Sequence, residues 1–382
     1  MLGLKSRLNS IYLRHIDPSR NIYSQLLPAE SRIVSSRSEG CSFYPVTDLE
    51  VAFNHDYRSN PNIFGDPFHI LELVSKARFE HPAQGIIKCK NFYIYGKNGW
   101  LINGDGFLLS DPTWYRQYEA ELPTRLNRRL PLHKLKGTVI SLCSDHSSNN
   151  YGHFLLDCLT RIRLLQGASI SLDDADHIII PKPPGPNAIS LCEKAGIPLA
   201  KCIWSDKDAL FYSNHLIATT FPGLRRSYPK WAASYLNGLN DFSREPPFRK
   251  IYIPRKSLTR NIINDASLQK IALHYGYEIY DPALASDQSS YEMFAQATHV
   301  VSAHGAALTD LAFCTAGAKI LELIPSDHIY PYYYTLSLAS DLVYHCIFGE
   351  SINVRPTGSV GPSPYDFVVD CDLFSESLRY LG

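Results

Sequence analysis

The chain has 382 residues, a length that exceeds one ordinary hydrophobic core and predicts two domains of about 150–200 residues each. Hydrophobic residues make up 45% and charged residues 19% of the sequence, which is typical of a globular protein and argues against a disordered one. Lys plus Arg and Asp plus Glu both number 37, so the net charge is zero. This balance argues against nucleic acid as a partner, because binding to a phosphate backbone usually needs a basic surplus.

Cysteine usage and targeting signals bear on the compartment. The nine cysteines are dispersed, with no CxxC pair and no Cys/His spacing typical of a metal site, which favours reduced thiols. The sequence has no Asn-x-Ser/Thr sequon, no signal peptide and no apolar run of about 18 residues. We therefore expect a cytoplasmic protein.

In chain order, the first predicted element is a helical extension over residues 1–40. Residues 1–20 are mildly basic and partly amphipathic. Such a segment either makes a peripheral contact with an anionic membrane, here at its inner face, or forms an ordinary surface or domain-packing helix. The second alternative is the commoner one.

Residues 85–111 have the pattern of a β-meander. Asn-Gly and Asp-Gly pairs within residues 96–99 and 103–106 supply the positive φ angles that tight hairpins require.

From about residue 137 onward, strands alternate with helices, which is the pattern of a parallel sheet. A Pro- and charge-rich stretch at residues 244–250 predicts a linker between a domain of residues 1–243 and one of residues 244–382. We expect two facing α/β domains, with ligands bound between them at the carboxyl ends of the strands. The predicted strands are residues 138–142, 177–180, 216–219, 250–253, 277–280, 299–302 and 319–324.

The first segment with chemical potential follows the strand at residues 138–142 and runs into a helix. His153, Asp157 and Arg161 have the spacing i, i+4, i+8 and therefore share one helix face. That polar stripe is either a catalytic or ligand-positioning face, or a solvated face with an ion pair.

The second segment delivers Arg255, Lys256 and Arg260 into a loop just before a predicted helix. Helix N-termini attract anions, and the planar guanidinium group suits phosphate oxygens, so a diphosphate is a natural ligand. The alternative is an exposed basic turn.

The third segment is a strand that ends at His304, Gly305 and Ala306 and opens a helix. Small residues there let a ligand approach the backbone N–H groups closely. Upstream, Ser289 and the glutamate three residues later have capping-box spacing. Downstream, Glu322 lies among apolar strand residues and needs a partner, either a ribose diol or a structural arginine.

Two Asp-x-Asp sequences are candidate metal ligands, at residues 174–176 and 370–372. The first precedes a predicted strand at its amino end, and the second lies near the carboxyl terminus. Neither position favours a metal site, and no metal is expected.

In this order the segments resemble glycosyltransferase family 61. That family has an Asn-Tyr-x-His-aromatic-x-x-Asp-x-x-x-Arg helix, a strand ending in Arg-Arg/Lys with a later Arg and Asn, a His-Gly-Ala-Gly-Leu-Thr-Asn turn, and a closing strand with Glu. The resemblance covers about residues 85–330. The matching residues are Asn150, Tyr151, His153, Phe154, Asp157, Arg161, Arg255, Lys256, Arg260, Asn264, His304, Gly305, Ala306, Leu308, Thr309 and Glu322.

Three positions depart from the family pattern. Ala307 stands where the family usually has Gly, Asp310 where it has Asn, and Asp265 where it has Glu. These differences bear on the identity of the donor more than on the fold.

The resemblance implies a GT-B-like fold, in which two Rossmann-like domains face each other across a cleft, and transfer with inversion at the anomeric carbon. Residues 1–243 would form the acceptor side and residues 244–382 would bind the nucleotide sugar. It also implies a bacterial-type member in surface polysaccharide or capsule synthesis, with a glycan or lipid-linked glycan as acceptor.

The same resemblance assigns roles to residues. His153 or Asp157 would be the catalytic base, and Asn150, Tyr151 and Arg161 would bind or position the acceptor. Guanidinium groups would do the work of a metal, so neither a metal nor a cofactor is expected besides the donor substrate. The expected donor-binding residues are Arg255, Lys256, Arg260, Asn264, His304, Gly305, Ala306, Thr309 and Glu322.

Two other functions remain as alternatives. One is a different nucleotide-sugar enzyme, an epimerase or a hydrolase. The other is a non-catalytic subunit that binds a nucleotide or a sugar.

Overall fold

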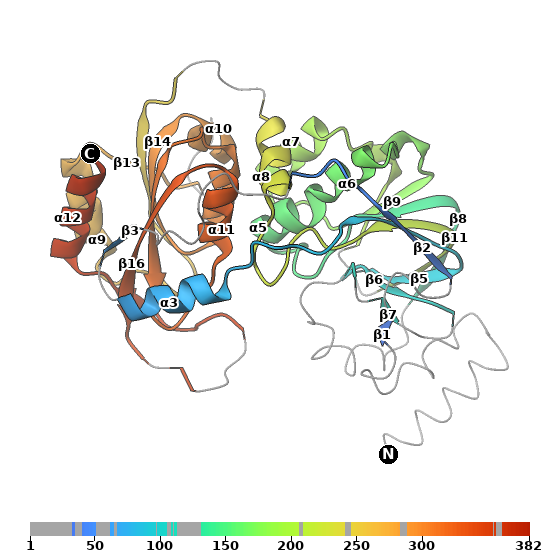
Figure 1. Cartoon of the computed structure of the whole chain (residues 1–382), viewed down its shortest axis with the longest axis horizontal. Coiled ribbons are helices and arrows are strands. Elements are labelled where there is room, and N and C mark those ends of the chain that lie inside the picture. Colours follow the sequence, from blue (N-terminus) through green and yellow to red (C-terminus); the bar gives the residue numbers. More distant parts are fainter. Residues whose placement is uncertain are drawn as a thin grey trace. The chain divides into compact units, whose positions relative to one another are not determined.

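A computed structural model of the whole chain gives its architecture (Figure 1). Among the residues described, no helix has the length and apolar character needed to cross a membrane. Of the predicted helical extension, only residues 33–34 and 40 are described, and residues 33–34 form a short strand, not a helix. Of the predicted linker, residues 244–245 lie outside the described residues, and residues 249–250 begin a strand. The described residues are 33–34, 40–50, 62–64, 67–96, 98–104, 108–109, 111–112, 131–205, 209–240, 246–282, 289–353, 355–356 and 361–382.

The chain forms two compact α/β units. Unit 1 comprises residues 1–49 and 82–222, and unit 2 comprises residues 50–81 and 223–382. The units therefore divide the chain at residue 222, whereas the sequence predicts a boundary after residue 243. They differ because α8 (Lys230–Gly238) packs on helices of unit 2, and because a short strand from residues 50–81 joins the sheet of unit 2.

The sheet of unit 2 is mostly parallel and has the order β13-β12-β14-β15-β16-β17. After β12, the next strand in the chain, β13, lies on one side of it. β14, β15 and β16 follow on the other side, so the strand order reverses between β12 and β14. β3 (Asn62–Phe64) extends the sheet parallel to β16, and β17 (Phe367–Val368) pairs antiparallel with the end of β16. The bounds are β12 (Arg249–Ile253), β13 (Glu278–Ile279), β14 (Ala297–Ala303), β15 (Lys319–Pro325) and β16 (Val343–Ser351).

Helices cover both faces of this sheet (Figure 1). On one face lie α9 (Asp265–His274) and α12 (Cys371–Leu381), whose Leu268 and Phe374 join strand residues in one buried apolar cluster. On the other face lie α10 (Ser290–Ala295) and α11 (Tyr332–Ala339). The eight-residue 3₁₀ helix η6 (Ala306–Phe313) contacts α8, α10 and α11.

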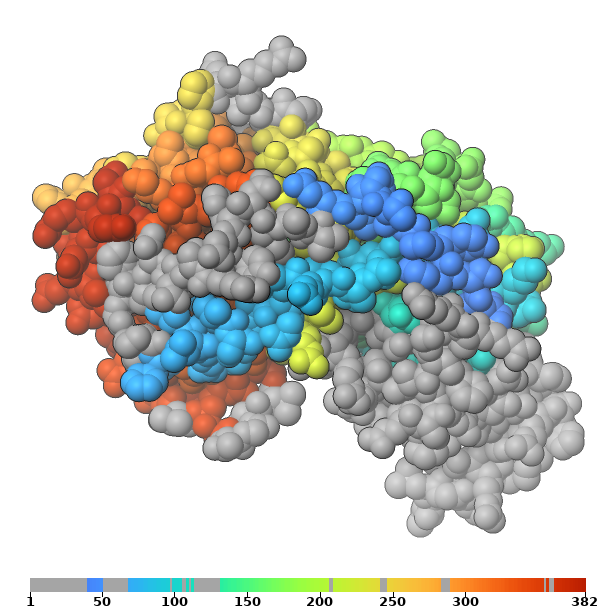
Figure 2. Space-filling model, viewed as in Figure 1, coloured from blue at the N-terminus to red at the C-terminus, as the bar shows by residue number. Residues whose placement is uncertain are grey.

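α3 (Pro67–Lys76) lies on the surface of unit 2 (Figure 2). α10 begins as its capping-box spacing predicts, because the backbone N–H of Ser289 donates to Glu292.

The sheet of unit 1 has a parallel half with the order β11-β8-β9-β10. Here the order reverses at β8, because β9 lies on one side of it and β11, the last of the four in the chain, lies on the other. Every strand predicted in this part of the chain is present, and β8 and β11 are longer than predicted. The bounds are β8 (Leu132–Ser141), β9 (His177–Ile180), β10 (Cys202–Trp204) and β11 (Leu210–Thr219).

The predicted meander is correct only in part. Successive strands β5, β6 and β7 pair antiparallel, and the first hairpin turns at Gly99, whose φ is 69°. β4 does not pair with β5, because both strands pair with β11, one after the other along its length. β2 pairs with β4 and β1 with β7. The bounds are β1 (Ile33–Val34), β2 (Cys41–Pro45), β4 (Gly85–Cys89), β5 (Phe92–Tyr95), β6 (Trp100–Ile102) and β7 (Leu108–Leu109).

A helical stretch of three successive segments follows β8. It starts as α5 (Tyr151–His153), continues as the π-helix η3 (Phe154–Leu159) and ends as α6 (Arg161–Gly167). Among the described residues of unit 1, the other helices are η4 (Leu172–Asp174), α7 (Pro186–Lys194) and η5 (Leu199–Lys201).

Candidate functional site

The reversal of strand order in unit 2 marks where its ligand site is expected. In open α/β sheets, ligands bind at the carboxyl ends of the strands where the order reverses. β12 ends at Ile253 and β14 ends at Ala303. Arg255 and His304 follow these two strands directly, so both stand at this point.

Arg255 is held by backbone acceptors. Its Nη1 donates to the carbonyl oxygen of His304 at 3.2 Å, and its Nε donates to the carbonyl oxygen of Thr259 at 3.2 Å. Burial and the neighbouring Arg260 lower the pKa of Arg255 to about 10, so the guanidinium is still charged at neutral pH. Among the described residues, no carboxylate forms an ion pair with this cation.

Arg260 lies in the same loop with a left-handed backbone, at a φ of 61°. Its Nη1 contacts Nε2 of His328, and its buried Nε has no hydrogen-bond partner in the described structure. Burial lowers the pKa of Arg260 from its ordinary value. The loop thus brings two cations together without a paired carboxylate in the described part of the chain, although burying such charges is costly.

His304 is anchored by a buried carboxylate. Its Nδ1 lies 2.5 Å from Oε1 of Glu322, and the hydroxyl of Tyr344 donates to Oε2 of the same carboxylate at 2.5 Å. Glu322 is fully buried. Its protein partners are therefore a histidine and a tyrosine, and no arginine pairs with it in the described part of the chain.

The remaining predicted donor residues of unit 2 are less closely grouped. Lys256 is exposed and pairs with Asp281 at 2.8 Å. The amide of Asn264 donates to the carbonyl oxygen of Val369 at 2.7 Å and accepts from its N–H at 3.2 Å, so it joins the loop to the segment before α12. Ala306 and Thr309 lie in η6, where Thr309 is fully buried.

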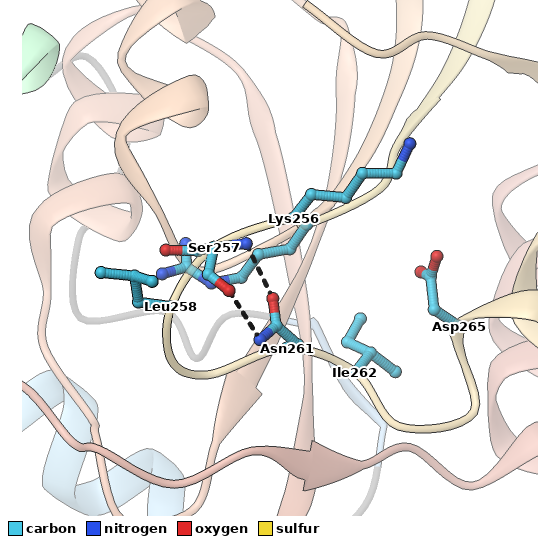
Figure 3. A pocket seen from close by; sticks show the side chains of 7 residues that line it. Lys256, Ser257, Leu258, Asn261, Ile262 and Asp265 are labelled. Atoms are coloured by element: carbon cyan, nitrogen blue, oxygen red, sulfur yellow. Dashed lines mark hydrogen bonds between the residues drawn. The ribbon is translucent and has the colours of Figure 1, made fainter. Parts of the chain in front are cut away.

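An open hollow of about 700 Å³ lies beside the loop (Figure 3). Asn261 holds the loop together on one side of this hollow. Its Oδ1 accepts from the N–H of Ser257 and its Nδ2 donates to the carbonyl oxygen of Ser257, both at 2.9 Å. Arg255 and Lys256 line this hollow, but Arg260 and His304 do not. The cluster of Arg255, Arg260 and His304 therefore rests on the contacts described above, and this hollow does not enclose it.

In unit 1, the residues predicted to be catalytic follow the carboxyl end of β8. Asn150 caps the helical stretch by accepting from the N–H of His153 at 3.2 Å. His153 Nδ1 lies 2.6 Å from Oδ2 of Asp157. Asp157 is fully buried, whereas the His153 side chain keeps 16% of its exposure. The pair therefore fixes the imidazole with Nδ1–H toward the carboxylate.

Of the alternative, a solvated helix face with an ion pair, the pair of His153 and Asp157 is present but the face is not solvated. All residues from Phe154 to Arg161 are buried, so Asp157 and Arg161 do not face solvent. The guanidinium of Arg161 donates to backbone carbonyl oxygens. Nε donates to that of Asp157 at 2.6 Å, Nη2 to that of Pro112 at 2.9 Å and Nη1 to that of Thr219 at 3.3 Å. Arg161 thus ties the π-helix to the end of β11.

Sequence reasoning missed several residues at both places. In unit 1, buried Asp145 accepts from the side chains of Asn98 and Trp100, and the His146 ring lies 5.5 Å from that of His153. Both residues stood inside the polar segment after β8, which was a usable signal.

In unit 2, the missed residues are His328 and Tyr344. They come from a loop and a strand that had no polar pattern of their own. Only the pairing of β14, β15 and β16 brings Tyr344 to the carboxylate.

The two Asp-x-Asp sequences have structural roles here. Asp176 accepts from the N–H of Thr138 at 2.7 Å, and Asp370 caps α12 by accepting from the N–H of Leu373 at 2.9 Å. Within the described ranges, no group of three or more His, Cys, Asp or Glu side chains is arranged to hold a metal ion.

Comparison with known families agrees with the resemblance found in the sequence. Residues 151–321 match the family model described as Glycosyltransferase 61. The matched segment begins in α5 and ends one residue before Glu322, so it includes His153, Arg255 and His304. No protein with curated annotation gives a significant match.

Proposed function

Because residues 151–321 match the Glycosyltransferase 61 family model, we propose that this chain transfers a sugar from a nucleotide-sugar donor to a hydroxyl of a glycan acceptor, with inversion at the anomeric carbon. One observation carries the proposal. Arg255, Arg260 and His304 meet at the strand-order reversal of unit 2, and the two arginines have no paired carboxylate in the described structure.

The donor site is proposed around these cations. Departure of a nucleoside diphosphate leaves negative charge on its phosphate oxygens, and preorganised donors stabilise that charge. Arg255 and Arg260 would supply charge-assisted hydrogen bonds to the diphosphate. The first amides of η6, which have no acceptor within the helix, would face the same anion.

The acceptor base is proposed to be His153. Inverting transfer needs a group that takes the proton of the acceptor hydroxyl as the new bond forms. With Nδ1 of His153 toward Asp157, Nε2 would be the atom that accepts that proton. Asp157, fully buried, would orient the ring and stabilise the imidazolium that forms.

The two units are proposed to be the acceptor and donor domains of a GT-B arrangement. The reaction is taken to need no metal, because guanidinium groups neutralise the leaving diphosphate. A glycan or lipid-linked glycan of a bacterial surface polysaccharide, such as a capsule, is the proposed acceptor, and a cytoplasmic location supplies the nucleotide sugar.

The test replaces His153 by Ala and compares it with His215→Ala, an exposed histidine of the same unit. In buffer with EDTA, turnover of His153→Ala should fall by ~10²–10⁴-fold while donor affinity stays near that of the wild type. His215→Ala should behave as the wild type. Loss of donor binding together with turnover would place His153 in the nucleotide site and overturn its role as base.

Product analysis separates the alternative activities. A glycosyltransferase releases nucleoside diphosphate and a glycosylated acceptor in equal amounts. Free sugar would identify a hydrolase, an isomerised nucleotide sugar an epimerase, and unchanged donor with every acceptor a binding subunit.

A further inference from the structure

Beyond the residues assigned above, we propose that His328 is a direct ligand of the donor diphosphate and donates through its Nε2–H beside Arg260. The inference rests on the proposed function, since it adds a residue to the same donor site. The observation behind it is a conflict of hydrogen-bond donors around the His328 ring.

Both ring nitrogens of His328 face donors. The backbone N–H of Ser363 donates to Nδ1 at 3.2 Å, and Nη1 of Arg260 contacts Nε2. A neutral imidazole has one acceptor nitrogen and one N–H, and a guanidinium has donors only. The ring can therefore satisfy one of these two donors but not both.

Protonation of the His328 ring does not satisfy these two donors. Protonation would turn both ring nitrogens into donors. The side chain is nearly buried, with 5% exposure. Burial lowers the pKa of His328 far below its ordinary value, and the neighbouring His304, Arg260, Arg355 and Arg226 act in the same direction. The ring is thus neutral at physiological pH.

The loop around His328 is fixed by a neighbouring carboxylate. Asp327 Oδ2 accepts from the hydroxyl of Ser363 at 2.5 Å, and its Oδ1 accepts from the hydroxyl of Ser351 at 2.5 Å. This arrangement holds the Ser363 N–H at Nδ1 of His328. Nδ1 then accepts, the proton resides on Nε2, and Nε2–H points to the guanidinium of Arg260.

An anionic oxygen would provide the acceptor that both Nε2–H of His328 and the guanidinium of Arg260 need. Placed beside both groups, it would accept from Nε2–H of His328 and from Arg260, whose buried Nε also has no partner in the described structure. The ring of His304 lies 5.2 Å from that of His328, so this oxygen would belong to the same anion as Arg255 and His304. The chemistry is that of a diphosphate, whose several oxygens suit separate donors.

The experiment measures binding of inorganic pyrophosphate to the whole chain by calorimetry. His328→Leu removes the donor and should weaken binding by about 10-fold or more, as expected for a hydrogen bond to a charged group. His328→Gln keeps an N–H in the region of Nε2 and should stay within about 3-fold of the wild type. His274→Leu, at an exposed position of α9, is the matched control and should leave affinity unchanged.

Two arginine variants separate this inference from the proposed function. Arg255→Gln should abolish measurable pyrophosphate binding, and Arg249→Gln, which removes a pair with Glu278 instead, should not. If Arg255→Gln binds as the wild type does, the donor site itself is wrong. If Arg255→Gln loses binding but His328→Leu retains it, only the role of His328 is overturned.

A second measurement covers the case in which His328→Leu does not fold. In the wild type with ¹⁵N-labelled histidine, pyrophosphate should leave the His328 ring with a proton on Nε2 and none on Nδ1. A proton on Nδ1 in the saturated complex would contradict the proposal.

Discussion

Gly305 determines where the cation next to it can lie. A Cβ at this position would meet Nη1 of Arg255 at 2.2 Å. The φ of Gly305 is 175°, an extended backbone open to any residue, so the need for glycine comes from the guanidinium and not from the chain conformation. The family pattern of His-Gly-Ala thus has a steric reason in this chain.

Gly305→Ala should therefore displace the Arg255 guanidinium and weaken pyrophosphate binding by ~10-fold, through loss of a charge-assisted hydrogen bond. The fold should persist, because the displaced group is the end of a flexible side chain. Calorimetry checks the affinity. Gly238→Ala is the control, since a Cβ there meets no atom within 4 Å. Equal affinities for the two variants would remove Arg255 from the binding site.

Individual site residues could be predicted where they directly follow the end of an apolar strand. Arg255 and His304 follow apolar strands, and their position at the carboxyl ends could be inferred from chain order alone. The partner of Glu322 could not, because it depends on the lateral pairing of β14, β15 and β16, which leaves no trace in local sequence.

The π-helix η3 is the element on which the candidate base depends. It lies within the stretch that carries His153, Asp157 and Arg161, and π-helical turns occur mostly as short interruptions at functional sites. The spacing i, i+4, i+8 of His153, Asp157 and Arg161 predicted one polar face of a regular α-helix here. Every residue from Phe154 to Arg161 is buried, so this stretch has no solvent-facing side. The period of its hydrophobic residues therefore could not reveal how its helix is wound.

Arg161→Met tests whether this element is held by the buried arginine. The variant leaves buried carbonyl oxygens of Asp157 and Pro112 without their donor and should lower the free energy of unfolding by about 1–3 kcal/mol for each of them. Arg163→Met, which removes surface contacts with Asp48, should leave the stability near that of the wild type. Urea denaturation measures both. If the two variants were equally stable, Arg161 would be free to serve the acceptor as the sequence suggested.

At the scale of the whole molecule, unit 2 is assembled from two separate parts of the chain. β3 pairs with β16, and α8 supplies buried Trp231 and Leu236 to its neighbours. The alternation of strands and helices predicted the parallel sheets of both units. It could not predict the contribution of residues 50–81, because a strand as short as Asn62–Phe64 has no detectable period.

A fragment of residues 244–382, the domain predicted from sequence, should consequently fail to fold cooperatively. It lacks β3 and α8, so the edge of β16 and the surfaces of α11 and η6 that contact α8 become exposed. Thermal unfolding followed by circular dichroism is the measurement. A fragment that melts in one sharp transition would show that residues 223–243 and 50–81 are dispensable for unit 2.

The most direct test of nucleotide-sugar binding is a thermal-shift panel of nucleotide sugars on the wild type and on Arg255→Gln, in buffer with EDTA. A donor present at 100 times its Kd stabilises the folded state by about 2.7 kcal/mol. We predict that at least one nucleotide sugar raises the melting temperature of the wild type, and that Arg255→Gln does not respond to it. A panel without any shift, or an equal shift in both proteins, would contradict a diphosphate site at Arg255.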